Sequence, residues 1–522
     1  MVEPPALRRP FGAVPSEDGL VSFRVWAPNA AHVAVRLSDD EHALEPVGDG
    51  VHETHVAARP GDDYRYVLDG GEPLPDPWSR WQPEGILGPS RVVDTAAFVW
   101  SDDAWEGLRL DELVLYELHV GTFTDGGTLE SAIPHLRELE ELGVTAVELM
   151  PVAEFPGERG WGYDGIFTSA PHHAYGGPEG LVRFVDAAHA AGLGVVLDVV
   201  YNHVGPGAQH AAFGPFFTDR HHTFWGDALD YAQAGVREWA LQNAELWVRD
   251  YHVDGLRLDA THAVFDDGPR HVLADLADRV RAVSPRVLVT SEMETGDLRP
   301  IEEWGHDAQW ADELHHEQHV ILTGEREGYY GAYAGSVEAL ARQLVREPPE
   351  RLIVCTQNHD QIGNRPFGDR PPRELQPLQA LVLLFAPQTP LLFMGQEHAD
   401  PAPFQFFTDH VDPLVADATR RGRREEFRDF AGFAAEDVPD PQDPETFARS
   451  KLTWTGEPAL RSLVQQLLRL RRELPRETEV GWNEEERWLV VRRGPVELVA
   501  NFSDREVDVG GTVVPPQSGV LR

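Results

Sequence analysis

The sequence contains one cysteine and one lysine among its 522 residues. Cys355 lies inside an apolar run, so no disulfide can form within the chain, and we expect a buried, unreactive thiol. Lys451 is the only lysine, so arginine supplies nearly all of the basic charge. We draw no function from that bias.

Basic charge is also scarce overall: 45 Lys and Arg residues face 87 Asp and Glu residues, for a net charge of −42. Nucleic acids and anionic membranes are bound by basic patches, so no nucleic acid and no membrane is expected as a partner. A neutral substrate fits this composition. No apolar run reaches the ~20 residues of a membrane helix. The first ten residues lack the apolar stretch of a signal peptide, which predicts a cytoplasmic protein.

Common metal and cofactor motifs are missing as well. No Cys/His spacing typical of a zinc site is present, and His–His pairs occur only at 172–173, 221–222 and 315–316. No glycine-rich phosphate loop or dinucleotide fingerprint is found. The sequence therefore predicts no metal and no cofactor.

The chain is too long for one core, so two or three domains are expected. Residues 1–100 alternate with period two in several short runs, which predicts a small N-terminal β-sandwich. Residues 101–476 alternate strand and helix, which predicts a parallel α/β domain. Residues 477–522 alternate again, which predicts a small C-terminal β domain.

Eight strand candidates occur in the middle part, and eight parallel βα units imply a closed (β/α)8 TIM barrel. The candidates are residues 113–118, 145–149, 194–199, 254–259, 287–292, 306–310, 351–356 and 390–394. Residues 178–192 predict one of the intervening helices, with Pro178 at its start and Gly192 at its C-cap. Residues 458–474 predict the last barrel helix. The Pro- and Asp-rich stretch 411–447 before it is interpreted as a loop.

Three acids follow apolar runs in this α/β region: Asp259, Glu292 and Asp360. An acid at a strand tip is costly unless it is paired or used. The C-terminal ends of barrel strands carry the chemistry in this fold, and a pair of carboxylates is what a glycosidase needs. Arg257 stands two residues before Asp259, so both point to one side of the strand, which favours an ionised Asp259 as nucleophile.

Glu292 follows V-L-V-T-S, and apolar neighbours favour a protonated carboxyl, as a general acid needs. Glu294 lies two residues on and stays open as the alternative acid. The segment W-G-Y-D-G (161–165) offers a Trp or Tyr to stack on a sugar, or simply loop packing.

These segments together resemble the α-amylase superfamily, glycoside hydrolase family thirteen. The resemblance rests on D-V-V-Y-N-H (198–203), G-L-R-L-D (255–259), S-E (291–292), N-H-D (358–360) and M-G-Q-E (394–397). Further stretches, among them R-G-W-G-Y-D-G (159–165) and D-A-Q-W-A-D-E-L-H-H (307–316), are similar to the maltooligosyltrehalose trehalohydrolase branch of that superfamily.

The resemblance implies a retaining glycosidase that acts on maltooligosyltrehalose and related α-glucans. It implies Asp259 as nucleophile, Glu292 as general acid and Asp360 as the third catalytic carboxylate. The implied substrate-binding residues are Tyr163, Asp164, His203, Arg257, His262, Asp312, His316, Glu325, His359, Gln361 and Asn364. His262, Asp312 and Glu325 are expected to help recognise trehalose on the leaving-group side.

Two other functions stay open at this point. A glycogen branching or debranching enzyme shares the sandwich-plus-barrel plan, and a non-catalytic glucan-binding protein would lack one of the three carboxylates. The loop at about 204–233 is short for the inserted domain of calcium-binding amylases, so no calcium requirement is expected.

Overall fold

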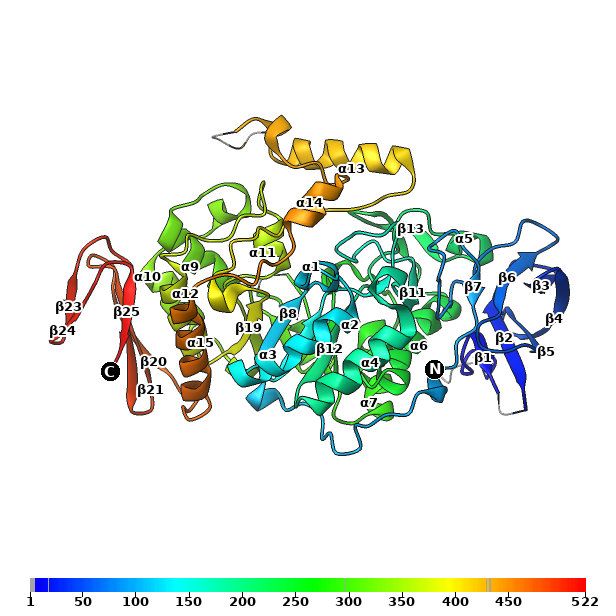
Figure 1. Ribbon diagram of the computed structural model, residues 1–522, viewed down its shortest axis with the longest axis horizontal. Coiled ribbons are helices and arrows are strands. Elements are labelled where there is room, and N and C mark those ends of the chain that lie inside the picture. The colour runs from blue at the N-terminus through cyan, green and yellow to red at the C-terminus, as the bar shows by residue number, and fades with distance from the viewer. Residues whose placement is uncertain (1–4, 17, 295, 429, 431–432) are drawn as a thin grey trace.

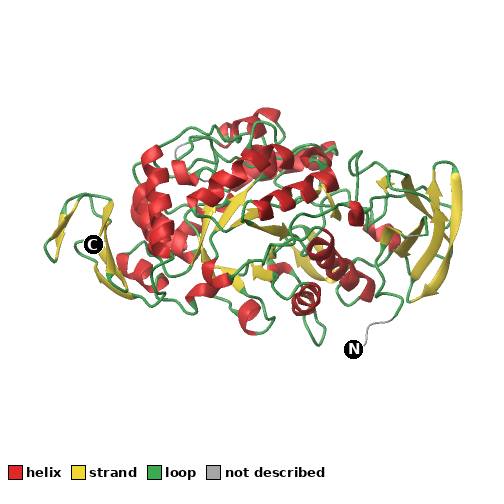
Figure 2. Cartoon of the chain, turned by 60° about the horizontal axis from the view of Figure 1, so that its bottom comes forward, coloured by secondary structure: helices red, strands yellow, loops and turns green. Residues whose placement is uncertain are grey.

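The computed structural model describes residues 5–16, 18–294, 296–428, 430 and 433–522. A β-sheet structure lies at each end of the molecule, and a barrel covered by helices lies between them (Figure 1). The strands of all three parts are visible together in Figure 2. The predicted fold class, a (β/α)8 barrel with an N-terminal β-sandwich and a small C-terminal β domain, is confirmed.

Eight parallel strands close the barrel, and each overlaps a strand predicted from the sequence. In chain order they are β8 (Leu115–Leu118), β9 (Ala146–Leu149), β12 (Gly194–Val199), β15 (Gly255–Leu258), β16 (Leu288–Ser291), β17 (Ala308–Trp310), β18 (Leu352–Val354) and β19 (Thr389–Phe393). The last strand pairs with the first, with Leu392 opposite Tyr116, and this pairing closes the cylinder.

Amphipathic helices surround the barrel. The longer ones are α4 (Gly177–Ala190), α6 (Ala234–Asp250), α7 (Val272–Val283), α9 (Glu313–Thr323), α12 (Gln376–Phe385) and α15 (Pro458–Arg471). The chain leaves α4 through Gly192 at φ +85°, the left-handed conformation predicted for that C-cap region. Within the described ranges, none of the helices combines the length and apolarity that spanning a bilayer requires.

The N-terminal strands form one antiparallel array in the order β1-β2-β5-β4-β3-β6-β7. Their bounds are β1 (Gly12–Pro15), β2 (Leu20–Trp26), β3 (Val33–Leu37), β4 (Asp40–Gly48), β5 (Val51–Ala57), β6 (Asp63–Leu68) and β7 (Ser90–Arg91). Trp26 packs edge-on against Phe216 of the barrel at 5.5 Å. A Cβ atom at Gly235, in α6, would lie 2.1 Å from the Trp26 ring, so only glycine permits this close approach.

The C-terminal strands form a four-stranded sheet, β20-β21-β22-β25, and a separate hairpin. Their bounds are β20 (Glu479–Asn483), β21 (Trp488–Arg493), β22 (Val496–Asn501), β23 (Val507–Val509), β24 (Thr512–Val514) and β25 (Ser518–Leu521). Buried Arg493 donates to the carbonyls of Phe385 and Ala386 at the end of α12, both at 3.1 Å, and to that of Pro475 at 2.8 Å. Arg471 donates to carbonyls of the same turn, including Leu384 at 3.2 Å.

The interpretation of residues 411–447 as a loop is wrong. The segment contains α13 (Pro413–Glu426) and α14 (Pro444–Arg449). Two of its Asp-Pro pairs, at 412–413 and 443–444, are helix starts: the side chain of Asp412, for example, accepts from the Leu414 amide at 2.8 Å, and Pro413 occupies the first turn. Most of α13 is exposed, so it lacks the apolar stripe by which a helix is normally recognised in a sequence.

We predict that Arg493→Ala lowers the free energy of unfolding by about 2–4 kcal/mol, because buried carbonyls lose a charged donor. The measurement is thermal and urea unfolding of the full chain. Arg492→Ala is the matched control, since Arg492 lies next to it on the same strand with its guanidinium exposed and bonded to Glu497. An equal loss of stability in both variants would contradict the role assigned to the Arg493 contacts.

Candidate active site

The predicted acids gather at the C-terminal rim of the barrel. Asp259 directly follows β15, and Glu292 directly follows β16. The sequence suggested that Asp360 ends a strand, and this is wrong. Strand β18 stops at Val354, and Asp360 lies in the first turn of α11 (His359–Gly363). Asn358 caps that helix, because its side chain accepts from the Gln361 amide at 2.7 Å.

One fully buried guanidinium, that of Arg257, organises the rim. Its Nη1 donates to Asp198 Oδ2 and to Asp259 Oδ1, both at 2.8 Å. Its Nη2 donates to Glu292 Oε2 at 2.7 Å. Its Cζ lies 4.3 Å from the centre of the Trp310 ring, so both terminal nitrogens are paired with carboxylates and the cation also contacts an indole, while Nε is buried without a hydrogen-bond partner among the described residues.

Backbone conformation sets the spacing of the two central acids. Ala260, directly after Asp259, has φ +40°, which turns the chain sharply at the strand end. Its amide then donates to Glu292 Oε2 at 2.9 Å. Asn202 Nδ2 holds the other oxygen of Asp259, Oδ2, at 2.8 Å. Both carboxylates therefore have fixed positions on one side of Arg257.

The two rival acids differ in environment. Glu292 is partly buried, with 23% of its side chain exposed, and contacts Arg257. Glu294 is exposed. The geometry therefore favours Glu292 as the member of the catalytic pair.

A chain of hydrogen-bonded polar groups runs from Arg257 to the opposite wall of the barrel. Tyr163 donates its hydroxyl to Asp198 at 2.7 Å and lies 2.7 Å from His359 Nε2. His359 Nδ1 donates to Glu117 Oε1 at 2.5 Å, and the His359 amide donates to Glu117 Oε2 at 2.9 Å. Burial alone would lower the pKa of His359, but the neighbouring carboxylates of Asp360 and Glu117 raise it to about 10. His359 is therefore an imidazolium that donates from both nitrogens.

Two barrel carboxyls in this region were missed by the sequence analysis. Glu117 in β8 accepts hydrogen bonds from His359. Glu148 in β9 lies opposite Glu117 on the neighbouring strand and is buried. Burial and the charge of Glu117 raise the pKa of Glu148 well above its ordinary value, so Glu148 is a neutral acid. An acid in the middle of an apolar strand, as in L-Y-E-L and A-V-E-L, is the sequence signal that could have identified both residues. The acids predicted from the sequence were those at strand ends.

Several predicted binding residues extend the site around Asp360. Asn364 Nδ2 donates to Asp360 Oδ1 at 3.0 Å. Gln361 Oε1 accepts from the Tyr329 hydroxyl at 2.9 Å, and the His316 ring packs edge-on against Tyr329 at 5.0 Å. Asp312 is partly buried, and desolvation followed by the charges of Glu292 and Asp360 raises its pKa to about 7.

His203 and Asp164 lie on the other side of Asp259. His203 bonds through Nδ1 to Asn202, and its ring stacks on Trp225 at 4.1 Å. Trp225 lies at the turn between β13 (Phe217–Thr223) and β14 (Gly226–Leu229), and the sequence analysis did not single it out. Asp164 Oδ2 lies 3.7 Å from His410 Nε2. These side chains form a second wall of the rim.

Three residues that were expected to contact the substrate directly have other surroundings in the structure. Glu325 is held by Arg365 at 2.7 Å and by His319 at 2.8 Å, and these contacts lower its pKa to about 2 although burial alone would raise it. His262 is exposed on the short helical turn η5 (Thr261–Ala263), just beyond the rim. Trp161 is buried and stacks on Phe404 at 5.1 Å, so in W-G-Y-D-G the Trp packs the loop and the Tyr faces the site.

The sequence matches two protein families. Residues 87–222 match the alpha amylase catalytic domain, and residues 10–79 match carbohydrate-binding module 48, the isoamylase N-terminal domain. A malto-oligosyltrehalose trehalohydrolase from Deinococcus radiodurans is 45% identical over 506 residues, which cover 90% of this chain and 84% of that protein. One from Saccharolobus solfataricus is 38% identical, with 97% of this chain and 95% of that protein covered.

Solved structures share the whole architecture. A Salmonella typhimurium protein assigned as an alpha amylase is 36% identical, with a TM-score of 0.91 and 98% and 99% of the two chains covered. A pullulanase from Anoxybacillus has a TM-score of 0.71 at 18% identity over 98% of this chain and 86% of that one, which shows the fold alone.

We predict that Glu117→Gln lowers the pH at which the His359 ring loses its proton, because one of the two carboxylates that raise its pKa is gone. The measurement is an NMR titration of protein labelled with ¹⁵N-histidine. Glu148→Gln is the matched control: it copies the neutral acid already present there and should leave the wild-type midpoint near its value of about 10. Equal shifts in both variants would contradict the distinction between the two carboxyls.

Proposed function

This chain belongs to the malto-oligosyltrehalose trehalohydrolase family, and on that premise we propose that its barrel rim hydrolyses maltooligosyltrehalose. The bond cleaved is the α-1,4-glucosidic bond next to the trehalose unit, and the products are trehalose and a maltooligosaccharide. The observation that carries the proposal is the pair Asp259 and Glu292 held on one guanidinium, within a chain that resembles trehalohydrolases along nearly its whole length.

The mechanism follows from the places of these two groups. Asp259 attacks the anomeric carbon of the sugar, and Arg257 and Asn202 hold its two oxygens in position. Glu292 gives its proton to the leaving trehalose oxygen. After trehalose leaves, Glu292 takes a proton from water, which attacks the glycosyl–Asp259 ester and releases the sugar with its configuration retained. Two acids on one guanidinium suit the ~5–5.5 Å separation that a retaining pair needs.

Asp360 and His359 supply the remaining contacts to the reacting sugar. Asn364 orients Asp360, and Glu117 orients the His359 imidazolium. A carboxylate and a cation fixed side by side can bind adjacent sugar hydroxyls and hold a distorted ring. Neither group exchanges a proton with substrate in this scheme, so their contribution is to the stability of the transition state.

Selectivity for trehalose is proposed to come from the leaving-group rim. Trehalose presents many fixed hydroxyls, and a site built to bond them leaves polar groups unpaired when another sugar occupies it. In this proposal Asp312 lines that side, and His262 reaches it from its exposed position just beyond the rim. Glu325 acts there through Arg365, because its carboxylate is already engaged by that guanidinium.

Product analysis tests the proposed function directly. Maltotriosyltrehalose is incubated with the protein, and the products are separated by chromatography. Free trehalose together with maltotriose supports the proposal. New α-1,6 branches from amylose would instead identify a branching enzyme, and loss of existing branches would identify a debranching enzyme. No change in any glucan would identify a binding protein.

We predict that Glu292→Gln lowers kcat on maltotriosyltrehalose by about 10²-fold or more, because the proton donor is lost. A glycoside with an activated aryl leaving group should recover much of kcat/KM, since its cleavage needs no proton, although release of the sugar from Asp259 stays slow without the base. Glu294→Gln is the matched control, and its exposed side chain predicts a change within about twofold. The opposite ranking would move the general acid to Glu294.

We predict a step in the pH profile of kcat/KM that belongs to Asp312. Its pKa of about 7 means that it is neutral below that pH and adds a negative charge beside Glu292 and Asp360 above it. A negative charge there stabilises the cationic, oxocarbenium-like transition state, so activity should rise as pH increases through 7 in the wild type, and Asp312→Asn, which cannot ionise, should lack this rise. Glu325→Gln should keep it, because Glu325, with a pKa of about 2, is ionised throughout. An unchanged profile in Asp312→Asn would refute the assignment.

A further inference from the structure

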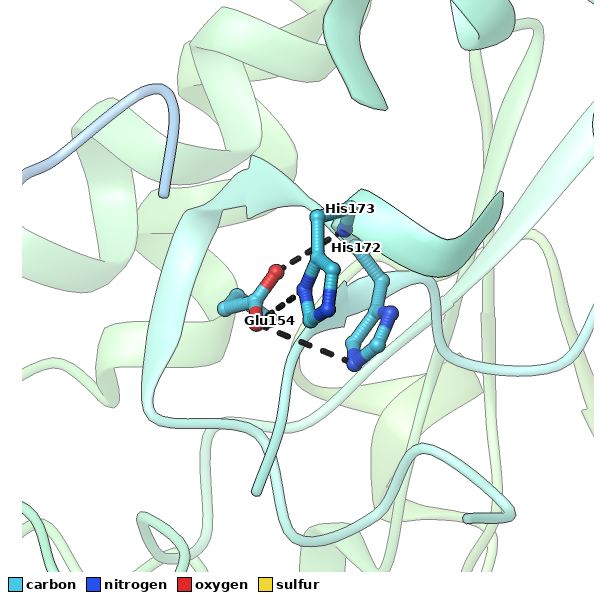
Figure 3. A group of neighbouring side chains, drawn as sticks. All are labelled: Glu154, His172 and His173. Atoms are coloured by element: carbon cyan, nitrogen blue, oxygen red, sulfur yellow. Dashed lines mark hydrogen bonds and ion pairs between the residues drawn. The ribbon is translucent and has the colours of Figure 1, made fainter. Parts of the chain in front are cut away.

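A second cluster of chemically active side chains lies beneath the loop that follows β9. Glu154 ends the short strand β10 (Ala153–Glu154), and His172 and His173 follow β11 (Phe167–Pro171), which pairs with it. Figure 3 shows the Glu154 carboxylate directed at both imidazole rings. Glu154 and His172 are fully buried, and 18% of the His173 side chain is exposed.

The donor atoms have the spacing of a metal site. Glu154 Oε1 lies 2.8 Å from His173 Nδ1 and 3.8 Å from His172 Nε2. One donor atom from each of the three residues lies within 4.8 Å of the others. Ligands at 2.0–2.2 Å from a tetrahedral zinc ion are about 3.3–3.5 Å apart, so these two distances bracket the required value.

The outer contacts of His173 and Glu154 resemble those of metal ligands. His173 Nε2 lies 3.0 Å from Glu158 Oε1, so its second nitrogen is oriented by a carboxylate. Glu154 Oε2 accepts the His173 amide at 3.0 Å, which leaves Oε1 to face both rings. Metal-bound histidines commonly donate their second N–H to such a carboxylate, which fixes the ring and its tautomer.

His172 provides an independent observation. Its Nε2 is buried and directed at Glu154, and it makes no hydrogen bond of good geometry with the described residues, although main-chain groups of Phe155 and Gly157 lie close to the ring. Its ring is held between Phe155, stacked at 3.7 Å, and His173, stacked at 4.5 Å. A buried polar atom without a partner is costly, and a cation at this point would satisfy it.

We propose that Glu154, His172 and His173 bind one divalent transition-metal ion of the zinc class, with water as the fourth ligand. The sequence analysis expected no metal, because Glu154 lies 18 residues before His172 and only the β10–β11 pairing brings them together. Binding releases the proton on His173 Nδ1, and it moves the single proton of the neutral His172 ring from Nε2 to Nδ1, which frees Nε2 for the metal. The His172 ring proton then resides on Nδ1, so the 3.1 Å hydrogen bond from the Ala174 amide to that atom breaks.

The ion has a structural role in this proposal. The segment between β10 and β11 carries Trp161 and Tyr163, and Tyr163 contacts Asp198 and His359 in the active site. A metal at Glu154, His172 and His173 ties the two ends of this segment together. It takes no part in the cleavage step, so the proposal does not depend on which glucan is cleaved.

The test is zinc binding to the full-length protein after removal of metals with a chelator. Calorimetric titration with zinc chloride should show one stoichiometric site, and zinc should raise the Tm. His172→Gln should lose that site. Glu158→Gln should weaken it by ~10–100-fold, as loss of an orienting carboxylate does. His222→Gln is the control, because His222 is an exposed histidine on β13, and it should bind zinc as the wild type does.

The outcomes separate a metal site from a metal-free ion network. Loss of the Ala174 amide hydrogen bond on zinc addition, seen as faster hydrogen exchange at that amide, would support the proposal. Absence of a stoichiometric site in the wild type, or equal affinity in wild type and His172→Gln, would overturn it and leave His173 bridging Glu154 and Glu158 through protons. If His172→Gln fails to fold, Glu158→Gln decides, because Glu158 is exposed and its replacement leaves the core intact.

Discussion

The buried guanidinium of Arg257 is the constraint on which the rest of the site depends. Moving a cation out of water costs desolvation free energy, and here contacts with three carboxyl groups and one indole ring offset that cost. The dependence is mutual, because without this cation the carboxyl groups of Asp198, Asp259 and Glu292 would lose the donor that they share at a buried rim. Arg257 is therefore proposed to matter both for the stability of the rim and for the position of the reacting acids. It can contact all three acids because it lies within β15 and is fully buried.

Charge alternates outward from that centre. Arg257 is followed by Asp198, then by the Tyr163 hydroxyl, the His359 imidazolium and the carboxylate of Glu117. Each link orients the next, so the direction of the His359 ring is set from the opposite wall of the barrel. The neutral acid Glu148 fits this pattern, since a further anion beside Glu117 would break the alternation. The reacting sugar would meet groups that are already in place, which is how preorganised sites lower a barrier.

The sequence predicted the barrel well because strand and helix periods alternate regularly there, and all eight strands were located. It predicted Asp259 and Glu292 because they directly follow strands whose boundaries are clear. It misplaced Asp360, whose strand ends early and whose position is set by the N-cap of a new helix. It missed α13 because the Pro- and Asp-rich composition of residues 411–447 was interpreted as a loop. Glu117 could not be recognised as a partner of His359, because 242 residues separate them and only closure of the barrel joins them.

The attachment of the C-terminal sheet has a consequence for how this fold can vary. Arg471 and Arg493 hold the end of α12 through its main-chain oxygens. Every residue type supplies that oxygen, so drift in the side chains of this turn leaves the attachment unchanged. A change on the arginine side cannot be rescued by a compensating change opposite, because there is no side chain to alter. Homologous chains should therefore show no covariation across this junction, even though it is one of the most tightly bonded in the molecule.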